Sequence, residues 1–222
     1  MSGRFITFEG GEGTGKSRHA ELLAQRLRTL GVGVVLTREP GGSPGAEIIR
    51  HVLLSGAAKP LGADAEAILF AAARDDHVRS TIQPALAQGR WVICDRFIDS
   101  TRVYQGALGK VDRKLIHGLE RVTIGALRPD ITFILDVPAD VGLARAKSRR
   151  GDGDADRFEG ETLEFHQKLR AAYLRLAATE SDRCVLIDTT QPRAQVATTI
   201  WNIVSQRLDP ATAPVTFESA AS

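Results

Sequence analysis

The stretch Gly10-Gly11-Glu12-Gly13-Thr14-Gly15-Lys16-Ser17 lies between an apolar run and a segment with helical periodicity. Its spacing, a glycine followed after four residues by Gly-Lys-Ser, predicts a phosphate-binding P-loop. Glycines let successive backbone N–H groups turn inward onto phosphate oxygens, and the N-terminal end of the next helix adds positive potential. A glycine-rich turn with an incidental lysine is the alternative. The strand before the loop and the helix after it favour the P-loop.

Lys16 and Ser17 have separate predicted roles in this loop. The Lys16 ammonium would neutralise β- and γ-phosphate oxygens, and the Ser17 hydroxyl would bind Mg²⁺. The expected ATP-binding residues are Gly10, Gly11, Glu12, Gly13, Thr14, Gly15, Lys16, Ser17 and Arg18.

The composition is that of one globular domain. The chain has 222 residues, and its 29 Lys and Arg residues nearly balance its 27 Asp and Glu residues, which disfavours bulk nucleic-acid binding. No apolar run approaches a membrane span, and the N-terminus lacks the apolar region of a signal peptide. We therefore expect a cytoplasmic protein without a membrane partner. Cys94 and Cys184 lie in apolar strand-like runs and are expected to be buried thiols.

Strand and helix signals alternate along the chain. Short continuous apolar runs at 4–9, 33–37, 91–95, 131–137 and 184–188 are typical of strands covered on both faces. Helical patterns lie at 16–30, 44–55, 65–88, 100–106, 112–127, 139–149, 160–179 and 193–207. This order predicts a three-layer α/β/α fold with a five-stranded parallel sheet that gathers ligands at its carboxyl edge. We expect one domain over 1–208, with a mobile lid at about 145–159, and a tail without regular structure over 209–222.

Further motifs follow the second and third predicted strands. They are Thr37-Arg38-Glu39-Pro40-Gly41-Gly42, Asp95-Arg96-Phe97, Asp99-Ser100-Thr101 and Tyr104-Gln105-Gly106, with a later Asp156-Arg157-Phe158-Glu159. Together with the P-loop, and in this order, they resemble the bacterial-type thymidylate kinases of the P-loop nucleoside monophosphate kinase superfamily. The resemblance covers positions 4 to about 207. It implies transfer of the γ-phosphoryl group of ATP to dTMP with Mg²⁺, by a homodimer.

Asp95 and Arg96 end the third predicted strand beside the P-loop. A carboxylate there could hold Mg²⁺ through water, so Ser17 and Asp95 are the predicted metal ligands; a strand-end cap is the alternative for Asp95. Arg96 suits an anion that accepts both prongs of its guanidinium fork. The resemblance makes that anion the phosphate of dTMP. A structural ion pair of Arg96 with Glu39 or Asp95 is the alternative and is compatible with this role.

Phe70 and Arg74 lie four residues apart, and therefore on one face of the helix predicted over 65–88. Taken alone, Phe70 is a core residue. The resemblance implies instead that Phe70 stacks on the pyrimidine ring and that Arg74 reaches its carbonyl edge or its phosphate.

The segment from Asp99 to Gln105 carries the other predicted acceptor contacts. Asp99 suits an N-cap, Thr101 and Gln105 face one way, and Ser100 and Tyr104 face another. The resemblance makes Thr101 and Gln105 base readers and Tyr104 a barrier to a ribose 2′-hydroxyl; without it they would be ordinary surface and cap residues. The expected acceptor residues are Glu12, Arg38, Glu39, Phe70, Arg74, Arg96, Ser100, Thr101, Tyr104 and Gln105.

The P-loop contains an acid, Glu12, and has no arginine among its variable positions. The resemblance implies that Glu12 contacts the 3′-hydroxyl of the acceptor sugar. Phosphoryl transfer spreads negative charge over equatorial oxygens and needs a cation beyond Lys16 and Mg²⁺. The basic residues Arg145, Lys147, Arg149 and Arg150 precede a glycine-rich stretch and suit a closing lid, although a solvated helix end fits the same pattern. The predicted catalytic residues are Lys16, Arg96, Arg149, Arg150 and Arg157, and which of the last three meets the γ-phosphate stays open.

Two other functions remain open at this point. One is another nucleoside or nucleoside monophosphate kinase, and the other is a P-loop switch ATPase that binds partners and hydrolyses ATP slowly. A switch would need a water-positioning residue in place of a nucleotide-sized acceptor pocket. An adenine pocket is expected at 188–192, largely through backbone groups. The predicted dimer surface draws on surplus apolar positions, among them Ile68, Leu69, Ile116, Leu119, Val122 and Leu127.

Overall fold

The computed structural model describes residues 3–151 and 157–210. Within them five strands form one parallel sheet in the order β2-β3-β1-β4-β5, which confirms the predicted α/β architecture. The strands are β1 (Phe5–Glu9), β2 (Val34–Arg38), β3 (Trp91–Asp95), β4 (Ile131–Asp136) and β5 (Cys184–Asp188). Each lies within about a residue of its predicted bounds; the central strands β1, β3 and β4 are buried between helices, whereas the edge strands β2 and β5 are partly exposed.

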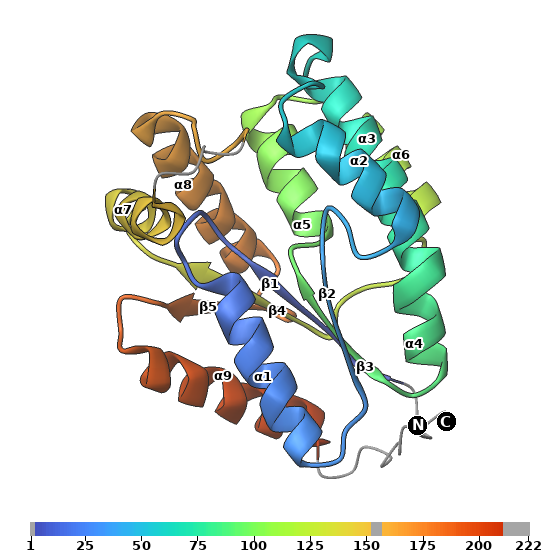
Figure 1. Ribbon diagram of the computed structural model, residues 1–222, viewed down its shortest axis with the longest axis vertical. Helices are drawn as coiled ribbons and strands as arrows, with labels where there is room; N and C mark the ends of the chain where they lie inside the picture. Colours follow the sequence, from blue (N-terminus) through green and yellow to red (C-terminus); the bar gives the residue numbers. More distant parts are fainter. Residues whose placement is uncertain (1–2, 152–156, 211–222) are drawn as a thin grey trace.

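Helices cover both faces of this sheet (Figure 1). On one face, α1 (Lys16–Thr29) and α9 (Arg193–Leu208) pack against the apolar side chains of the central strands. On the other face lie α4 (Gln83–Ala87), α5 (Ile98–Thr101) and α8 (Leu163–Thr179). The remaining helices are α2 (Pro44–Leu54), the short η1 (Lys59–Leu61), α3 (Ala63–His77), α6 (Arg113–Thr123) and α7 (Ala139–Arg150); α2 packs on α3, and α3 on α6.

Two of the predicted helices contain wider π turns. The helix expected over 65–88 consists of α3, η2 (Val78–Ile82) and α4, and α5 continues into η3 (Arg102–Leu108). Pro84 lacks an N–H and its ring crowds the carbonyl of Ser80, four residues earlier, which explains the π turn of η2. The η3 turn has no proline, and it lies beside the candidate site, where π turns are frequent.

The sheet brings the expected ligand-binding segments together. β1 lies between β3 and β4, with Phe8 beside Asp95, so the P-loop after β1 and the motif after β3 leave the same edge. Cys94 and Cys184 are buried free thiols, as predicted. Among the described residues, no helix is both long and apolar enough to cross a membrane. Residues 152–156 of the expected lid and 211–222 of the expected tail lie outside the described residues.

Candidate functional site

The P-loop joins β1 to α1 and depends on its glycines. Gly13 and Gly15 adopt φ values of 68° and 88°, a region that favours glycine. A Cβ on Gly13 would lie 1.9 Å from the carbonyl oxygen of Gly142 in α7, so the loop and α7 meet backbone to backbone. The Lys16 ammonium donates to the carbonyl oxygen of Gly11 at 2.7 Å. The predicted loop is thus formed, and it is held against the helix that carries Arg149 and Arg150.

Ser17 and Asp95, the two predicted metal ligands, are adjacent. The Ser17 hydroxyl donates to Asp95 Oδ2 at 2.5 Å, and Asp95 Oδ1 is buried without a hydrogen-bond partner among the described residues. A buried oxygen of this kind fits an ion or its water shell. Within the described residues, no group of three His, Cys, Asp or Glu side chains could hold a metal by itself. This donor set fits Mg²⁺, which keeps several waters and shares its coordination with phosphates.

Arg96 lies at the centre of the site in an uncommon backbone conformation. Its φ is 67°, its backbone N–H donates to Phe8 at 2.8 Å, and its guanidinium donates to Glu12 Oε1 at 2.7 Å and to the carbonyl of Gly10 at 3.2 Å. A strained residue held by several contacts is typical of a functional site. Arg96 does form an ion pair, as the structural alternative predicted, but its partner is Glu12 and not Glu39 or Asp95.

Charges in this region perturb one another. Burial alone would raise the pKa of Glu12, but Lys16 and Arg96 outweigh it and hold that pKa below its ordinary value. Burial, assisted by the positive charge of Arg96, lowers the pKa of Lys16 to about 8. The cations of the site thus dominate the shift of Glu12, whereas burial dominates that of Lys16.

On the acceptor side, Arg74 is buried in a network with Glu39. Arg74 Nε donates to Glu39 Oε2 at 2.8 Å, and its Nη2 donates to the Thr101 hydroxyl at 3.0 Å. His77, which sequence reasoning missed, places Nδ1 3.0 Å from Glu39 Oε1 and Nε2 2.7 Å from the Thr37 hydroxyl. The signal available for His77 was its spacing of three residues from Arg74 on the same helix face. Glu39 therefore orients Arg74 and His77 as well as bordering the site.

One cavity of about 860 Å³ connects the P-loop with the acceptor side. Both predicted pairs of acceptor residues on α5 and η3, Ser100 with Tyr104 and Thr101 with Gln105, border this cavity. Asp99 is not an N-cap but a fully buried acid paired with Arg183 and Arg102. The predicted residues that line the cavity are Glu12, Gly13, Thr14, Gly15, Lys16, Ser17, Arg18, Arg38, Glu39, Phe70, Arg74, Asp95, Arg96, Ser100, Thr101, Tyr104, Gln105 and Arg149.

Phe158 borders the same cavity and was not predicted as a site residue. Its ring packs edge-on against Tyr104 with centroids 5.1 Å apart, and it lies 6.2 Å from the ring of Phe70. The signal for Phe158 was its place between Arg157 and Glu159 in the last quoted motif. These three rings form an apolar wall on the acceptor side, where a planar base would stack.

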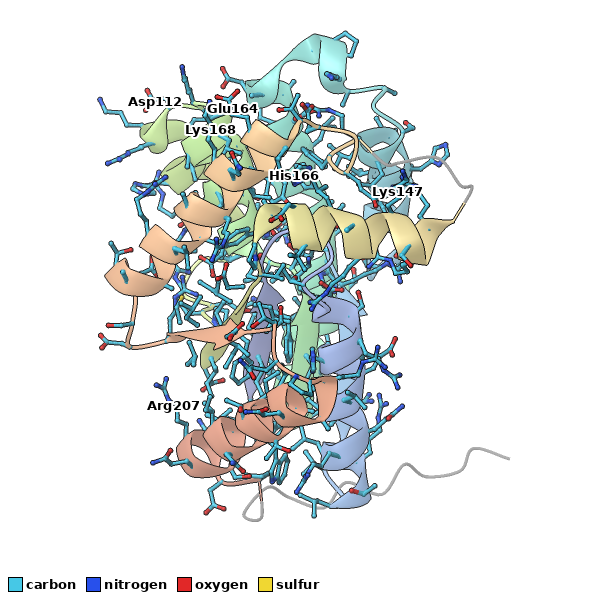
Figure 2. All side chains as sticks on the ribbon, turned by 90° about the vertical axis from the view of Figure 1, so that its left-hand side faces the viewer. Asp112, Lys147, Glu164, His166, Lys168 and Arg207 are labelled. Carbon is cyan, nitrogen blue, oxygen red and sulfur yellow. The ribbon has the colours of Figure 1, made fainter. Side chains whose placement is uncertain are left out.

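The predicted lid arginines occupy different positions. Arg149 lines the cavity, whereas Arg150 pairs with Glu159 at 2.6 Å and Arg157 pairs with Glu66 and Glu161 outside the cavity lining. Figure 2 shows α7 with Lys147 projecting from it, and His166 of α8 lies beside the first turns of α7. The structure therefore brings Arg149 to the site, pairs Arg150 within the lid segment, and pairs Arg157 with Glu66 of α3 and with Glu161.

The donor end of the cavity includes part of the predicted adenine pocket. Thr189 and Gln191 line it, together with His19 and Arg193, which sequence reasoning missed. Arg145 donates to the carbonyl oxygen of Thr189 at 3.0 Å and so connects α7 to this loop. The P-loop thus borders one end of the cavity, Arg38 and Arg74 border the other, and Arg96 lies between them. This is the arrangement of a P-loop kinase that acts on a second phosphorylated ligand.

Comparisons with known proteins narrow this class. The family model described as thymidylate kinase matches residues 8–200. The thymidylate kinase of Bradyrhizobium sp. (strain ORS 278) is 62% identical over 206 residues, which are 93% of this chain and 91% of the relative. That of Bradyrhizobium diazoefficiens is 60% identical over 213 residues, 96% and 93% of the two chains. A crystal structure of thymidylate kinase from Ehrlichia chaffeensis matches with a TM-score of 0.74 and 34% identity, and covers 92% of this chain and 100% of the other. The chain belongs to the thymidylate kinase family.

Proposed function

We propose that this chain transfers the γ-phosphoryl group of ATP to the 5′-phosphate of dTMP and so forms dTDP and ADP. The observation that carries this proposal is the single cavity that joins the P-loop to the acceptor pocket, with Arg96 at the junction. Family membership supports dTMP as the acceptor, since relatives at 60–62% identity are named thymidylate kinase.

The side chains of the site have complementary tasks in this reaction. Ser17 and, through water, Asp95 would hold Mg²⁺, which would supply positive charge against the donor phosphates. Lys16, Arg96 and Arg149 would hold the two phosphate groups in line and offset the charge that develops between them. The acceptor phosphate is already ionised near neutral pH, so no side chain has to remove a proton from it.

The acceptor pocket supports a deoxynucleotide with a pyrimidine base. Phe70, Tyr104 and Phe158 provide aromatic surface for the base, and Thr101 and Gln105 provide polar groups for its edge. We assign to the Tyr104 ring the exclusion of a 2′-hydroxyl.

The test is a coupled assay for ADP release with the purified chain, ATP and Mg²⁺, with and without dTMP. We expect turnover to require dTMP, and a folded Lys16→Ala variant to lose orders of magnitude of it, because the charge at the transferring group is removed. Turnover without an acceptor, with no rise on adding dTMP, would favour a switch ATPase. A higher kcat/KM for another nucleoside monophosphate would favour the second kinase class.

We also propose that the chain is a homodimer that uses the exposed faces of α3 and α6. Ile68 on α3 and Val122 on α6 are 49% and 72% exposed, whereas Ile116 belongs to the core with Ala67 and Val111. Exposed apolar side chains on adjoining helices suit a subunit interface. Light scattering at micromolar concentration should give twice the mass of one chain, and the mass of one chain would reject the dimer. A cytoplasmic location and the lack of nucleic-acid or membrane partners remain proposals from the sequence.

A further inference from the structure

Glu9, the last residue of β1, is a fully buried acid that the mechanism above does not use. It directly precedes the P-loop, but its carboxylate turns toward the segment that follows β3. Burial of an acid is costly unless several donors reach it. Its contacts therefore indicate what it holds in place.

Three of the four contacts of Glu9 come from the Phe97–Ser100 turn, which borders the acceptor pocket, and the fourth comes from Tyr173 on α8. Oε1 accepts the backbone N–H groups of Phe97 at 2.8 Å and Ser100 at 3.1 Å. Oε2 accepts the hydroxyls of Ser100 at 2.7 Å and Tyr173 at 2.9 Å. The first turn of α5 has no side-chain cap of its own, so Glu9 supplies from β1 the acceptor that a capping residue would provide.

These contacts also constrain Arg96. The carbonyl of Phe8 accepts the N–H of Arg96, and Glu9 accepts the N–H groups on the far side of the turn. The two last residues of β1 thus hold the strained φ of 67° at Arg96. The hydroxyls of Ser100 and Tyr173, both held by Glu9, lie 3.4 Å and 3.5 Å from Arg96 Nη1.

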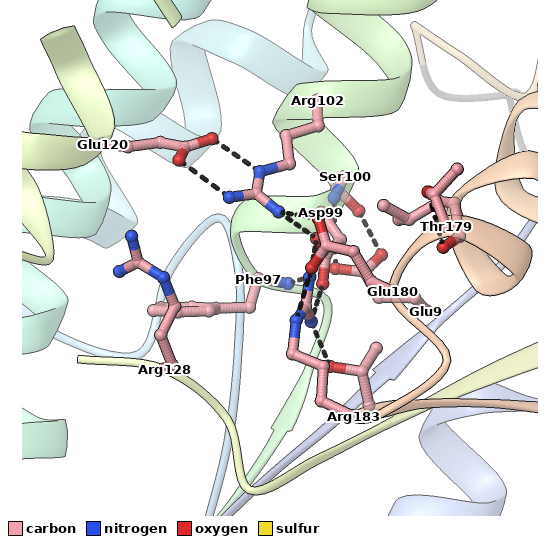
Figure 3. A network of polar contacts seen from close by, with 12 residues as sticks. Glu9, Phe97, Asp99, Ser100, Arg102, Glu120, Arg128, Thr179, Glu180 and Arg183 are labelled. Atoms are coloured by element: carbon pink, nitrogen blue, oxygen red, sulfur yellow. Dashed lines mark hydrogen bonds and ion pairs between the residues drawn. The ribbon is translucent and has the colours of Figure 1, made fainter. Parts of the chain in front are cut away.

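Charged neighbours surround this carboxylate, as Figure 3 shows. Asp99 lies close by and is compensated by Arg183 and Arg102, and Arg102 is also held by Glu120. Burial and the negative charge of Asp99 raise the pKa of Glu9 to about 7, while Arg96 and the hydrogen bonds oppose them. An acid maintained against this cost must satisfy donors that an apolar residue would leave unpaired.

We propose that Glu9 is a positioning residue for phosphoryl transfer, which acts through its hydrogen bonds to the Phe97–Ser100 turn and to Tyr173 so that Arg96 and Ser100 face the acceptor. This inference rests on the proposed function, because the acceptor phosphate is what Arg96 would meet. Glu9 itself does not line the cavity.

The test compares Glu9→Leu with Glu9→Gln, and uses Glu120→Leu as a matched control. The amide oxygen of Gln can accept both backbone N–H groups, and its NH₂ can donate to the two hydroxyls, which accept as well as donate. We therefore expect Glu9→Leu to lower kcat/KM for dTMP by about 100-fold or more, and Glu9→Gln to retain it within about tenfold. Binding of ATP without acceptor, measured by calorimetry, should change less than about threefold in both variants, because the P-loop contacts remain.

Glu120 provides the control because it is a buried acid of the same network that does not reach the cavity. Glu120→Leu should lower the melting temperature but leave KM for dTMP and kcat unchanged. If Glu9→Leu does not fold, Tyr173→Phe removes one donor to Glu9 with little change in shape, and it should raise KM for dTMP several-fold.

Three results would overturn the proposal while leaving the proposed function intact. The first is an unchanged kcat/KM for dTMP in Glu9→Leu. The second is a loss of ATP affinity in that variant as large as its loss of kcat/KM for dTMP. The third is an unchanged KM for dTMP in Tyr173→Phe. A wild-type chain without activity toward dTMP would overturn the proposed function, and the role of Glu9 with it.

Discussion

Gly142 in α7 offers a sharp test of how the lid helix is positioned. A Cβ at this residue would lie 2.5 Å from the carbonyl oxygen of Glu12 and 3.1 Å from Val137 Cγ1. The contact at 2.5 Å is with backbone, which cannot rotate away as a flexible side chain can. Gly142→Ala should therefore push α7 and the P-loop apart.

The size of the effect follows from these distances. Ordinary contact begins near 3.4 Å, so α7 must shift by roughly 1 Å, and Arg149, two turns further along the helix, shifts with it. A misplacement of about 1 Å at a reacting group costs about 100-fold in rate. Overpacking of this kind costs about 1–3 kcal/mol of stability, offset by about 1 kcal/mol from replacing glycine in a helix.

Steady-state kinetics at saturating ATP and dTMP would measure the loss of kcat, and thermal unfolding would measure stability. Gly118→Ala in α6 is the matched control, because a Cβ there meets no atom within 4 Å. It should raise the melting temperature by about 2–4 °C, with kcat unchanged. A Gly142→Ala protein with kcat within twofold of wild type would refute the claim that this contact sets the position of Arg149.

Three further predictions concern other parts of the site. Tyr104→Ala should reduce the discrimination between dTMP and its ribose counterpart, expressed as the free-energy difference between their kcat/KM values, by about 1–3 kcal/mol. An unchanged ratio of the two kcat/KM values would remove Tyr104 from that role. Arg149→Ala should lower kcat far more than it raises KM for dTMP, whereas Arg150→Ala, which breaks the pair with Glu159, should affect kcat less; equal effects would contradict the assignment of Arg149 to the site. Because the pKa of Glu9 is about 7 in the folded protein against an ordinary 4.5, the folded chain keeps a proton in this window that the unfolded chain has released. The free energy of unfolding should therefore fall by up to roughly 3 kcal/mol as pH rises from 4.5 to 7, and urea unfolding should show a flatter dependence for Glu9→Gln; identical slopes would argue against the shifted pKa.

The sequence was sufficient for the strands and for the P-loop because both depend on local information. Each strand is a short run rich in apolar residues, and the alternation of such runs with helical patterns predicts a parallel sheet, although it does not determine the order of the strands. The spacing from Gly10 to Ser17 determines which backbone groups can converge on a phosphate, whatever surrounds the loop. The strand-end motifs then share one edge because parallel strands all point the same way.

The polar partners of the site could not be predicted in the same way. Arg96 pairs with Glu12, and Asp99 with Arg183, across 84 residues of sequence in each case. Such pairs depend on which side chains the folded backbone brings within reach, and several candidates of suitable charge are available to each arginine. The π turns after Thr101 and His77 were also not predicted, because the helical pattern of the sequence does not distinguish a π turn from an α turn.

The Arg96–Glu12 pair gives the site a physical reason for an acid in its P-loop. A guanidinium buried without a counter-charge would be strongly unfavourable, and Glu12 offsets that cost at 2.7 Å. A phosphate that approaches Arg96 must compete with this carboxylate, so part of its binding energy goes into rearranging the pair. Arg96 is held in place meanwhile by Phe8 through its backbone, which lets the side chain exchange partners without a change in the strained turn. Glu12 thus lowers the affinity of the Arg96 guanidinium for an anion, and Phe8 of β1 fixes the position of the Arg96 backbone.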